Sequence, residues 1–417
     1  MMARRLMRPR EIKPLLRLRP PTIDPVERRL GKAQTIADLR HIARRHTPRA
    51  VFDYTDGAAD GEVSLRRARQ LFRDIEFVPS VLRDVSDLDT VTHPLGRESA
   101  QPFGFGPTGF TRLMHHSGEA AVGAVAARRK IPYALSTMGT TAIEELAINV
   151  PDGRLWFQLY VWRDRAPAAD LVARASAAGY EALMLTVDTP VGGNRLRDVR
   201  NGFTLPPTLS LRTFGEMALH PRWWGNLLTT PPLTFASLNA WDGTVAELID
   251  TLFDPSMTIE DLAWVRSMWA GPLIVKGIQS VADARLVIEA GADVVLLSNH
   301  GGRQLDRAPV PLRLLPEVVA EVGDRAEVWL DTGVTNGADI VAAIALGADF
   351  VLVGRAYLFG LMAGGERGVD RAAEILSREV ARTMRLLGAT RISDLTPNQV
   401  RLPARSAAVP VEAERRS

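Results

Sequence analysis

One local pattern recurs along the chain and restricts its fold more than any other feature. Each copy consists of a helix end, a glycine, a short link, an apolar run and then polar residues. The copies read AAGYEALMLTVD at 177–188, EAGADVVLLSNH at 289–300 and ALGADFVLVGRA at 345–356. Their glycines, Gly179, Gly291 and Gly347, suit the left-handed position that ends a helix. The apolar runs do not alternate with polar residues, which is typical of parallel strands covered on both faces.

Further apolar segments extend this series. Strands are expected at 102–109, 132–137, 155–161, 272–278 and 327–334. Helical segments such as 280–290 and 336–346 lie between them, so strands and helices alternate with short links. An open doubly wound sheet would also satisfy this alternation. The number of units and the length of 417 residues favour a closed (β/α)8 TIM barrel with an N-terminal helical segment.

The expected barrel domain spans 35–403 and leaves both ends of the chain outside it. Residues 1–34 are basic and broken by prolines, which predicts a poorly ordered tail; weak attraction to an acidic membrane surface is the alternative. Residues 404–417 are expected to be disordered. The domain should open with a helix at 35–45, because Thr35 and Asp38 form a capping pattern.

Residues 201–257 interrupt the alternation with prolines and scattered aromatic residues. A long irregular excursion within a barrel is usually functional, so we expect a lid-like insert over the active face. Trp223 and Trp224 in this insert are expected to pack back onto the barrel, because aromatic side chains chiefly supply buried area. Contact with lipid or with a partner is the alternative.

Composition excludes several classes of function. The chain has no cysteine, which excludes disulfides, thiolate metal sites, iron–sulfur clusters and a thiol nucleophile. Its net charge is only +3 and no basic run is interleaved with aromatics, so no nucleic-acid partner is expected. The expected site contains no metal. No stretch approaches the roughly 18 apolar residues of a membrane span, and the first residues lack the apolar core of a signal peptide. We therefore expect a cytoplasmic protein.

Chemically active residues gather where the expected strands end. In the stretch SNHGGRQLD at 298–306, His300 and Arg303 are separated by two glycines that let the backbone turn back on itself. A histidine near neutral pH can take a proton, and an arginine binds a carboxylate through its planar fork. A 2-hydroxy acid offers both groups. The pair therefore favours a catalytic role for His300 over a structural one.

Other strand ends carry complementary groups. Asp188 ends the strand within 177–188 and could orient His300 and stabilise its protonated form. Arg195, on the loop beyond, would add a second carboxylate contact; taken singly, each would more often form a surface ion pair. Lys276 ends an apolar strand and must reach water, pair with a charge or have a shifted pKa. Its partner would be an anionic cofactor or, alternatively, a salt bridge in the barrel mouth.

Two glycine-containing strand ends predict a phosphate site. DTGVTNG at 331–337 and LVGRAY at 352–357 place glycines before helix N-termini, where backbone N–H groups can hold phosphate. Barrels often bind phosphate at their last two strand–helix loops, and Arg355 would add a charge. The stretch GFGPTG at 104–109 matches a dinucleotide motif only in letters. Pro107 lies inside it, no clear helix follows, and no acidic residue stands at the expected distance, so a backbone shelf against a flat ring is the better interpretation.

These residues together resemble the FMN-dependent L-2-hydroxy-acid oxidase and dehydrogenase family over roughly 35–400, and most closely its actinobacterial L-lactate dehydrogenase-like members. SNHGGRQLD is similar to the active-site signature of that family. The resemblance implies His300 as catalytic base with Asp188 as its partner, Arg303 and Arg195 as carboxylate ligands, and Tyr54 and Tyr160 as substrate contacts. It also implies FMN as cofactor, a quinone as electron acceptor, a homotetramer and a possible peripheral contact with the inner membrane face.

The resemblance further assigns the cofactor-binding residues. The flavin ring would rest against Pro107, Thr108 and Gly109, its edge would bond to Ser136, Gln158 and Thr186, and Lys276 would stabilise its negative charge. Ser298 and Asp331 would bind the ribityl chain, and Gly333, Gly354 and Arg355 the phosphate. Two positions depart from the pattern: Thr335 stands where many members have an arginine, which removes one phosphate contact, and Met138 stands where glycolate oxidase has a bulky aromatic residue.

The expected reaction is oxidation of L-lactate, or of a close relative, to the 2-oxo acid. The sequence leaves open whether His300 removes the proton from carbon or from oxygen. Three alternatives also stay open: an oxidase that reduces O2 to peroxide, an enzyme acting on a larger peptide-derived substrate, and a non-catalytic flavin-binding scaffold.

Overall fold

The computed structural model describes residues 8–12, 23–202, 215, 218–238 and 253–404. Within these ranges the fold is a closed barrel of eight parallel strands, β2 to β9, in sequential order. The strands are β2 (Phe103–Phe105), β3 (Tyr133–Ser136), β4 (Leu155–Leu159), β5 (Ala182–Thr186), β6 (Leu273–Ile278), β7 (Val294–Leu297), β8 (Glu327–Leu330) and β9 (Phe350–Val353). Each falls within a segment that the sequence predicts as a strand, and the predicted (β/α)8 barrel is confirmed.

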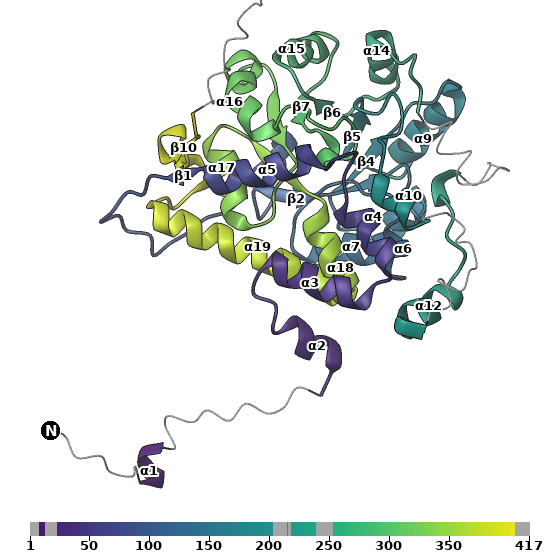
Figure 1. The fold of residues 1–417 in the computed structure, drawn as a ribbon. Coiled ribbons are helices and arrows are strands. Elements are labelled where there is room, and N and C mark those ends of the chain that lie inside the picture. Colours follow the sequence, from purple (N-terminus) through teal and green to yellow (C-terminus); the bar gives the residue numbers. More distant parts are fainter. Residues whose placement is uncertain (1–7, 13–22, 203–214, 216–217, 239–252, 405–417) are drawn as a thin grey trace, which may run out of the picture.

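Helices cover the outside of the barrel (Figure 1). They are α7 (Gly118–Arg128), α8 (Ile143–Asn149), α9 (Arg165–Ala177), α14 (Ile259–Met268), α15 (Val281–Glu289), α16 (Pro311–Val322), α17 (Gly337–Ala345), α18 (Arg355–Gly364) and α19 (Glu366–Leu387). Gly179, Gly291 and Gly347 have φ values of 77°, 98° and 104°, so the predicted left-handed helix ends are confirmed. Because each helix stops there, the chain turns directly into the next strand.

Two apolar layers explain why the strands have no polar face. The outer layer lies between strands and helices and includes Val275, Leu297 and Leu330. The inner layer fills the barrel, where the rings of Trp156 and Trp329 stack with centroids 4.9 Å apart. Apolar residues on both faces of a strand are what a non-alternating run predicts. The filled interior leaves the C-terminal ends of the strands as the place for chemistry.

The N-terminal segment forms α1 (Pro9–Ile12), α2 (Pro25–Leu30), α3 (Ile36–His46), α4 (Arg49–Asp56) and α5 (Val63–Asp74). Thr35 and Asp38 cap α3 reciprocally, as predicted. The prediction of a poorly ordered tail at 1–34 needs a correction at its C-terminal end. Leu30 and Ala33 are buried, and α2 packs against α18, because a short apolar stripe there finds a partner that sequence alone does not reveal. The predicted tail at 405–417 lies outside the described residues.

The predicted insert at 201–257 is described only in part, since 203–214, 216–217 and 239–252 lie outside the described residues. Its helix α12 (Pro221–Leu228) carries both tryptophans. Trp223 Nε1 donates to Leu113 O over 3.1 Å, and Trp224 is buried. The expected packing of this pair onto the barrel is therefore confirmed. Among the described residues, no helix has both the length and the apolarity needed to cross a bilayer.

The remaining elements are short. After β2 the chain forms α6 (Thr111–Met114), a four-residue helix that the sequence interpretation of GFGPTG did not anticipate. After β5 it forms α10 (Leu196–Arg200). An antiparallel pair of β1 (Glu76–Phe77) and β10 (Val400–Arg401) joins the two ends of the domain. The barrel, with α4, α5 and α10 near its C-terminal mouth, is what positions the site.

Candidate active site

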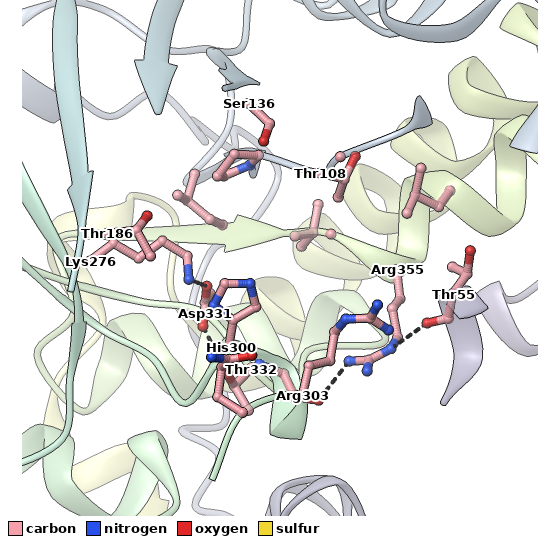
Figure 2. Close-up of a pocket in the computed structure, with 18 of the residues that line it drawn as sticks. Thr55, Thr108, Ser136, Thr186, Lys276, His300, Arg303, Asp331, Thr332 and Arg355 are labelled. Atoms are coloured by element: carbon pink, nitrogen blue, oxygen red, sulfur yellow. Dashed lines mark hydrogen bonds and ion pairs between the residues drawn. The ribbon is translucent and has the colours of Figure 1, made fainter. Parts of the chain in front are cut away.

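The C-terminal ends of the barrel strands open into one pocket that collects nearly every predicted site residue. Figure 2 shows Ser136 and Thr108 on one side of it and His300 and Arg303 on the other. The predicted residues that line it are Tyr54, Pro107, Thr108, Gly109, Ser136, Gln158, Tyr160, Thr186, Arg195, Lys276, His300, Arg303, Asp331, Gly333, Gly354 and Arg355. Asp188 and Ser298 lie just behind the lining, where they bond to His300 and Lys276.

The centre of the pocket is a histidine–aspartate pair. His300 Nδ1 lies 3.1 Å from Asp188 Oδ1, and the Asp188 side chain is only 1% exposed while that of His300 is 23% exposed. The aspartate follows β5 and the histidine follows β7, so the barrel brings together residues 112 positions apart. Because the Nδ1 atom faces Asp188, Nε2 is the nitrogen that remains for a substrate.

A tight turn holds His300 in place. Its φ is 57°, in the left-handed region, and Gly301 and Gly302 also have positive φ values. Ser298 Oγ accepts from His300 N at 3.0 Å, and Asn299 Oδ1 accepts from Gly302 N at 2.9 Å. Positive φ is costly for a residue with a Cβ and persists only where surrounding bonds determine it. The turn therefore fixes the direction of the imidazole.

Thr332, which the sequence analysis missed, supports this turn from the next strand. Its Oγ1 accepts from Gly301 N at 3.1 Å and donates to Asp331 Oδ1 at 2.8 Å. Its φ of 77° is unusual for a β-branched residue. No sequence signal marks a threonine for this role, because the bond forms between two loops.

The electrostatics set His300 as neutral and Asp188 as ionised. Burial, together with the Lys276 ammonium, lowers the pKa of His300, and the attraction of Asp188 does not offset this. Burial by itself would raise the pKa of Asp188, but its interactions with His300, including their hydrogen bond, and with the Lys276 charge outweigh it, and the pKa lies below its usual range. A neutral imidazole beside a fixed carboxylate can accept a proton and be stabilised once it has done so.

Two guanidiniums lie beside this pair over one aromatic ring. The Cζ atoms of Arg303 and Arg195 are 4.8 and 5.7 Å from the centroid of the Tyr54 ring. Arg303 also donates to the backbone oxygens of Tyr54 and Gly57. Burial, then repulsion from Arg195, lowers the pKa of Arg303 to about 10. Two cations held this close favour the arrival of an anion between them.

Unpartnered polar atoms mark the same region. In the described part of the chain, Asp188 Oδ2 and Arg195 Nε are buried without a hydrogen-bond partner. Buried polar groups are usually bonded, and an exception in a pocket indicates a site for a ligand. Tyr160 lies close by, 7% exposed, and its ring packs edge-on against Phe253 with centroids 5.7 Å apart. Burial raises the pKa of Tyr160, which keeps its hydroxyl protonated as a donor.

A row of polar side chains crosses the ends of β3, β4 and β5. Ser136 Oγ donates to Gln158 Oε1, and Gln158 Nε2 donates to Thr186 Oγ1, each over 3.0 Å. At the end of β6, Lys276 Nζ donates to Ser298 Oγ at 3.1 Å and lies 3.7 Å from Asp331 Oδ2. The salt bridge in the barrel mouth that the sequence left open is therefore present. Figure 2 shows Lys276 and Asp331 next to His300.

The backbone after β2 forms the facing shelf. A Cβ added at Gly109 would lie 2.9 Å from Met138 Cβ, so only glycine allows this approach. Thr108 Oγ1 is 2.6 Å from Tyr357 Oη, which in turn donates to Gly106 O. The shelf of Pro107, Thr108 and Gly109 is thus held from behind by α18.

Glycines and arginines meet at the far end of the pocket. Gly333 has a φ of 87°, and Gly354 caps α18 at its N-terminus. Arg355 donates to three backbone oxygens, those of Thr55, Gly301 and Gly57, over 2.8, 2.9 and 2.7 Å. Burial lowers the pKa of Arg355 to about 9. Arg69 on α5, which the sequence analysis did not single out, lines the same end.

Gln304 is a further residue that the sequence analysis missed. Its Oε1 accepts from Gly193 N at 3.1 Å, and its Nε2 donates to Val191 O at 2.9 Å. These bonds tie the loop that carries Arg195 to the turn that carries Arg303. Gln304 follows Arg303 directly in the sequence, so its place within the signature was the one signal available.

Comparisons with known proteins agree with this site. The family described as FMN-dependent dehydrogenase matches residues 43–402. A Mycobacterium tuberculosis protein named "Putative L-lactate dehydrogenase" is 58% identical over 397 residues, covering 95% of this chain and 96% of that protein. An L-lactate dehydrogenase of Stenotrophomonas maltophilia is 39% identical, covering 86% and 96%.

A solved structure agrees in fold as well as in sequence. That of the monotopic membrane protein (S)-mandelate dehydrogenase is 37% identical, with a TM-score of 0.86, and covers 89% of this chain and all of that one. The family model spans the whole barrel and the whole pocket, and the chain belongs to the family of FMN-dependent dehydrogenases.

Proposed function

We propose that this enzyme oxidises an L-2-hydroxy acid, with L-lactate as its preferred substrate, and uses FMN as the electron acceptor within the protein. The observation that carries the proposal is the His300–Asp188 pair, 3.1 Å apart, in one pocket with Arg195 and Arg303. A base beside two guanidiniums suits a molecule that has a carboxylate and a removable proton on the neighbouring carbon or its hydroxyl. The two relatives named for L-lactate support the choice of substrate.

The residues divide the work as follows. Arg303 and Arg195 bind the substrate carboxylate, and the hydroxyls of Tyr54 and Tyr160 contact the polar groups of the substrate. His300 Nε2 accepts the proton, because Nδ1 faces Asp188. The ionised Asp188 stabilises the imidazolium that forms and keeps the ring in the orientation needed to accept the proton. Such a base contributes about 10²–10⁴-fold to the rate.

The pocket residues suit FMN in shape and in chemistry. The shelf of Pro107, Thr108 and Gly109 would support the flavin ring, with Ser136, Gln158 and Thr186 along its edge and Lys276 as a counter-charge. Ser298 and Asp331 would bind the ribityl chain, and Gly333, Gly354 and Arg355 the phosphate. Because they lack a Cβ, Gly109 packs closely against Met138 and Gly333 packs closely against Ala68 and Phe72, which fixes the two backbone segments that would border the cofactor. When bound, FMN supplies the acceptor for two electrons.

One assay tests the proposal directly. The purified protein is mixed with excess L-lactate under anaerobic conditions, and the yellow absorbance of oxidised flavin is followed. We expect rapid bleaching with L-lactate and none with D-lactate, because the arginines would fix the carboxylate and His300 the proton that is removed, so only one enantiomer would present its remaining reacting group to the flavin. A yellow protein that keeps its colour with every hydroxy acid tried would be a flavin-binding scaffold, and the proposal would be wrong.

A larger aromatic hydroxy acid is a second candidate substrate. The similar structures include (S)-mandelate dehydrogenase and a mandelate oxidase variant with (S)-mandelic acid, the latter 36% identical with a TM-score of 0.77 and covering 90% of this chain and all of that one. Met138 and Phe253 line the pocket here. Comparing kcat/KM for L-lactate and (S)-mandelate decides between them, since the preferred substrate has the higher value.

The electron acceptor, assembly and location complete the proposal. We infer that a quinone reoxidises the flavin. We also infer that the enzyme is a homotetramer. Its proposed location is the cytoplasm, with a peripheral contact to the inner membrane face. The monotopic membrane relative supports the last point. Peroxide formed at the rate of lactate oxidation in air would instead identify an oxidase. Light scattering after chromatography tests the tetramer, and flotation with anionic vesicles tests the membrane contact.

A further inference from the structure

The phosphate end of the pocket contains a second arginine, on a helix that the cofactor assignments above do not include. We infer that Arg69 on α5 binds the phosphate of FMN together with Arg355; the inference rests on the proposed placement of that phosphate at Gly333 and Gly354. Both arginines line the pocket, and they lie near one another, since after burial and Arg303 the charge of Arg69 also lowers the pKa of Arg355. They come from helices whose sequence positions are far apart, so the barrel alone does not account for their meeting.

The N–H groups of the Arg69 guanidinium are available to an anion. In the part of the chain that the structure describes, its guanidinium makes neither a hydrogen bond nor an ion pair. The carboxylate that attracts it most is Asp56. Asp56 Oδ1 already accepts from Arg40 Nε at 2.6 Å. Asp56 Oδ2 accepts from Arg40 Nη2 at 2.7 Å and from Arg197 Nη1 at 3.1 Å. A partly buried cation whose most strongly attracting carboxylate is shared in this way is costly unless another anion arrives.

Arg355 can offer a dianion only part of its guanidinium, because most of its donors are engaged. It donates to the oxygens of Thr55, Gly57 and Gly301, which leaves one N–H on each terminal nitrogen. The loop after β8 offers no cation either. Thr335 N and Oγ1 both donate to Asp339 Oδ2, over 2.7 and 3.1 Å. The second positive charge at this end must therefore come from outside the two phosphate loops.

The packing of α5 explains why its arginine reaches the site. A Cβ added at Gly333 would lie 3.1 Å from Ala68 Cβ and equally close to the Phe72 ring. A Cβ added at Gly302 would lie 2.9 Å from Leu65 N. The helix thus lies directly against the Gly333 loop and the His300 turn. Arg69 follows Ala68 and lies where a phosphate held by Gly333 would need a charge.

The test compares FMN with riboflavin, which lacks the phosphate. Holoenzyme of the wild type and of Arg69→Gln is diluted, and the fluorescence of released flavin gives the dissociation constant of FMN. Riboflavin is titrated into the flavin-depleted full chain. We expect Arg69→Gln to weaken FMN binding by about 10- to 100-fold, the range of one charge-assisted hydrogen bond, and to leave riboflavin binding unchanged. Arg67→Gln is the matched control, since Arg67 is exposed on the same helix.

Each outcome separates this inference from the proposed function. If wild-type protein binds FMN no better than riboflavin, the placement of the phosphate is wrong. If it prefers FMN and Arg69→Gln keeps that preference, Arg69 is not a phosphate ligand. Weaker binding of both flavins by Arg69→Gln would indicate a structural role and would also overturn the inference. Partial recovery of FMN affinity in Arg69→Lys, which retains the charge, would support it.

Discussion

The two anion-binding ends of the pocket are built alike and differ in one respect. Each end has one arginine that donates to backbone oxygens of the segment 54–57, Arg303 at the substrate end and Arg355 at the phosphate end. Each also has one, Arg195 or Arg69, whose guanidinium makes no hydrogen bond within the described ranges. In the proposed function, only the substrate end has a base, His300. The anchored arginine would fix the shape of each end, and the open one would supply affinity for the anion.

This difference predicts that substitutions at the two ends affect different measurements. Changes at the substrate end should alter turnover and leave FMN in place. Changes at the phosphate end, such as Arg69→Gln, should alter FMN retention and leave the KM for substrate unchanged while the flavin stays bound. The following predictions test that separation, from the largest expected effect to the smallest.

Replacing the base should give the largest loss. His300→Ala should reduce the rate of flavin bleaching by L-lactate about 10²–10⁴-fold, because it removes the group that accepts the proton. The protein should remain yellow with unchanged FMN affinity. Stopped-flow absorbance measures the rate, and His41→Ala, an exposed histidine on α3, is the control. A rate within threefold of wild type would show that His300 is not the base.

A smaller loss of activity is expected when a substitution keeps the positive charge of a side chain but changes its geometry. Arg303→Lys retains the positive charge but lacks the planar fork, so kcat/KM for L-lactate should fall by about 10–100-fold, mostly through KM. Steady-state kinetics with an artificial acceptor measure this. Arg200→Lys, exposed at the end of α10, should behave as wild type. Looser FMN binding in Arg303→Lys would break the proposed separation of the two ends.

The smallest effect concerns pH. Because burial and Lys276 lower the pKa of His300, its imidazole should stay neutral to a pH below the ordinary value of about 6.5. The acid limb of kcat/KM for L-lactate should therefore lie below that value, and lowering the pH from 7.5 to 6.5 should reduce kcat/KM less than about twofold. Asp188→Asn should move the limb to still lower pH, since the carboxylate raises the pKa of His300. A limb above pH 7 would contradict this charge balance.

The strand ends show how far sequence reasoning could go. Non-alternating apolar runs and helix-ending glycines predict all eight barrel strands, because these signals are local. The polar residues at strand ends could be grouped in advance, since parallel strands in a barrel open at the same mouth. His300, Asp188 and Lys276 were all found this way. Tyr54 and Tyr160 came only from the resemblance to a family, since nothing local distinguishes a substrate-contacting tyrosine from a buried one.

Other residues could not be predicted from local patterns. Arg66, Arg67, Arg69 and Arg73 stand close together on α5, and only the contact of α5 with Gly333 decides that Arg69 lines the pocket. Thr332 acquires its role from a bond to a loop 31 residues away. Leu30 and Ala33 resemble part of a tail until α18 covers them.

Sequence by itself predicted the barrel, the strand ends where the polar side chains gather, and the His300–Asp188 pair at their centre. These depend on the apolar pattern of each strand and on the residue types at its end. Both are properties of short stretches of sequence. Tertiary structure alone decided which arginines are anchored and which are open, because that depends on contacts between segments far apart in the chain. The many arginines of the chain have the same intrinsic tendencies. Packing between distant segments decides which of them bind backbone oxygens and which face the pocket, because it sets the space and the hydrogen-bond acceptors around each one.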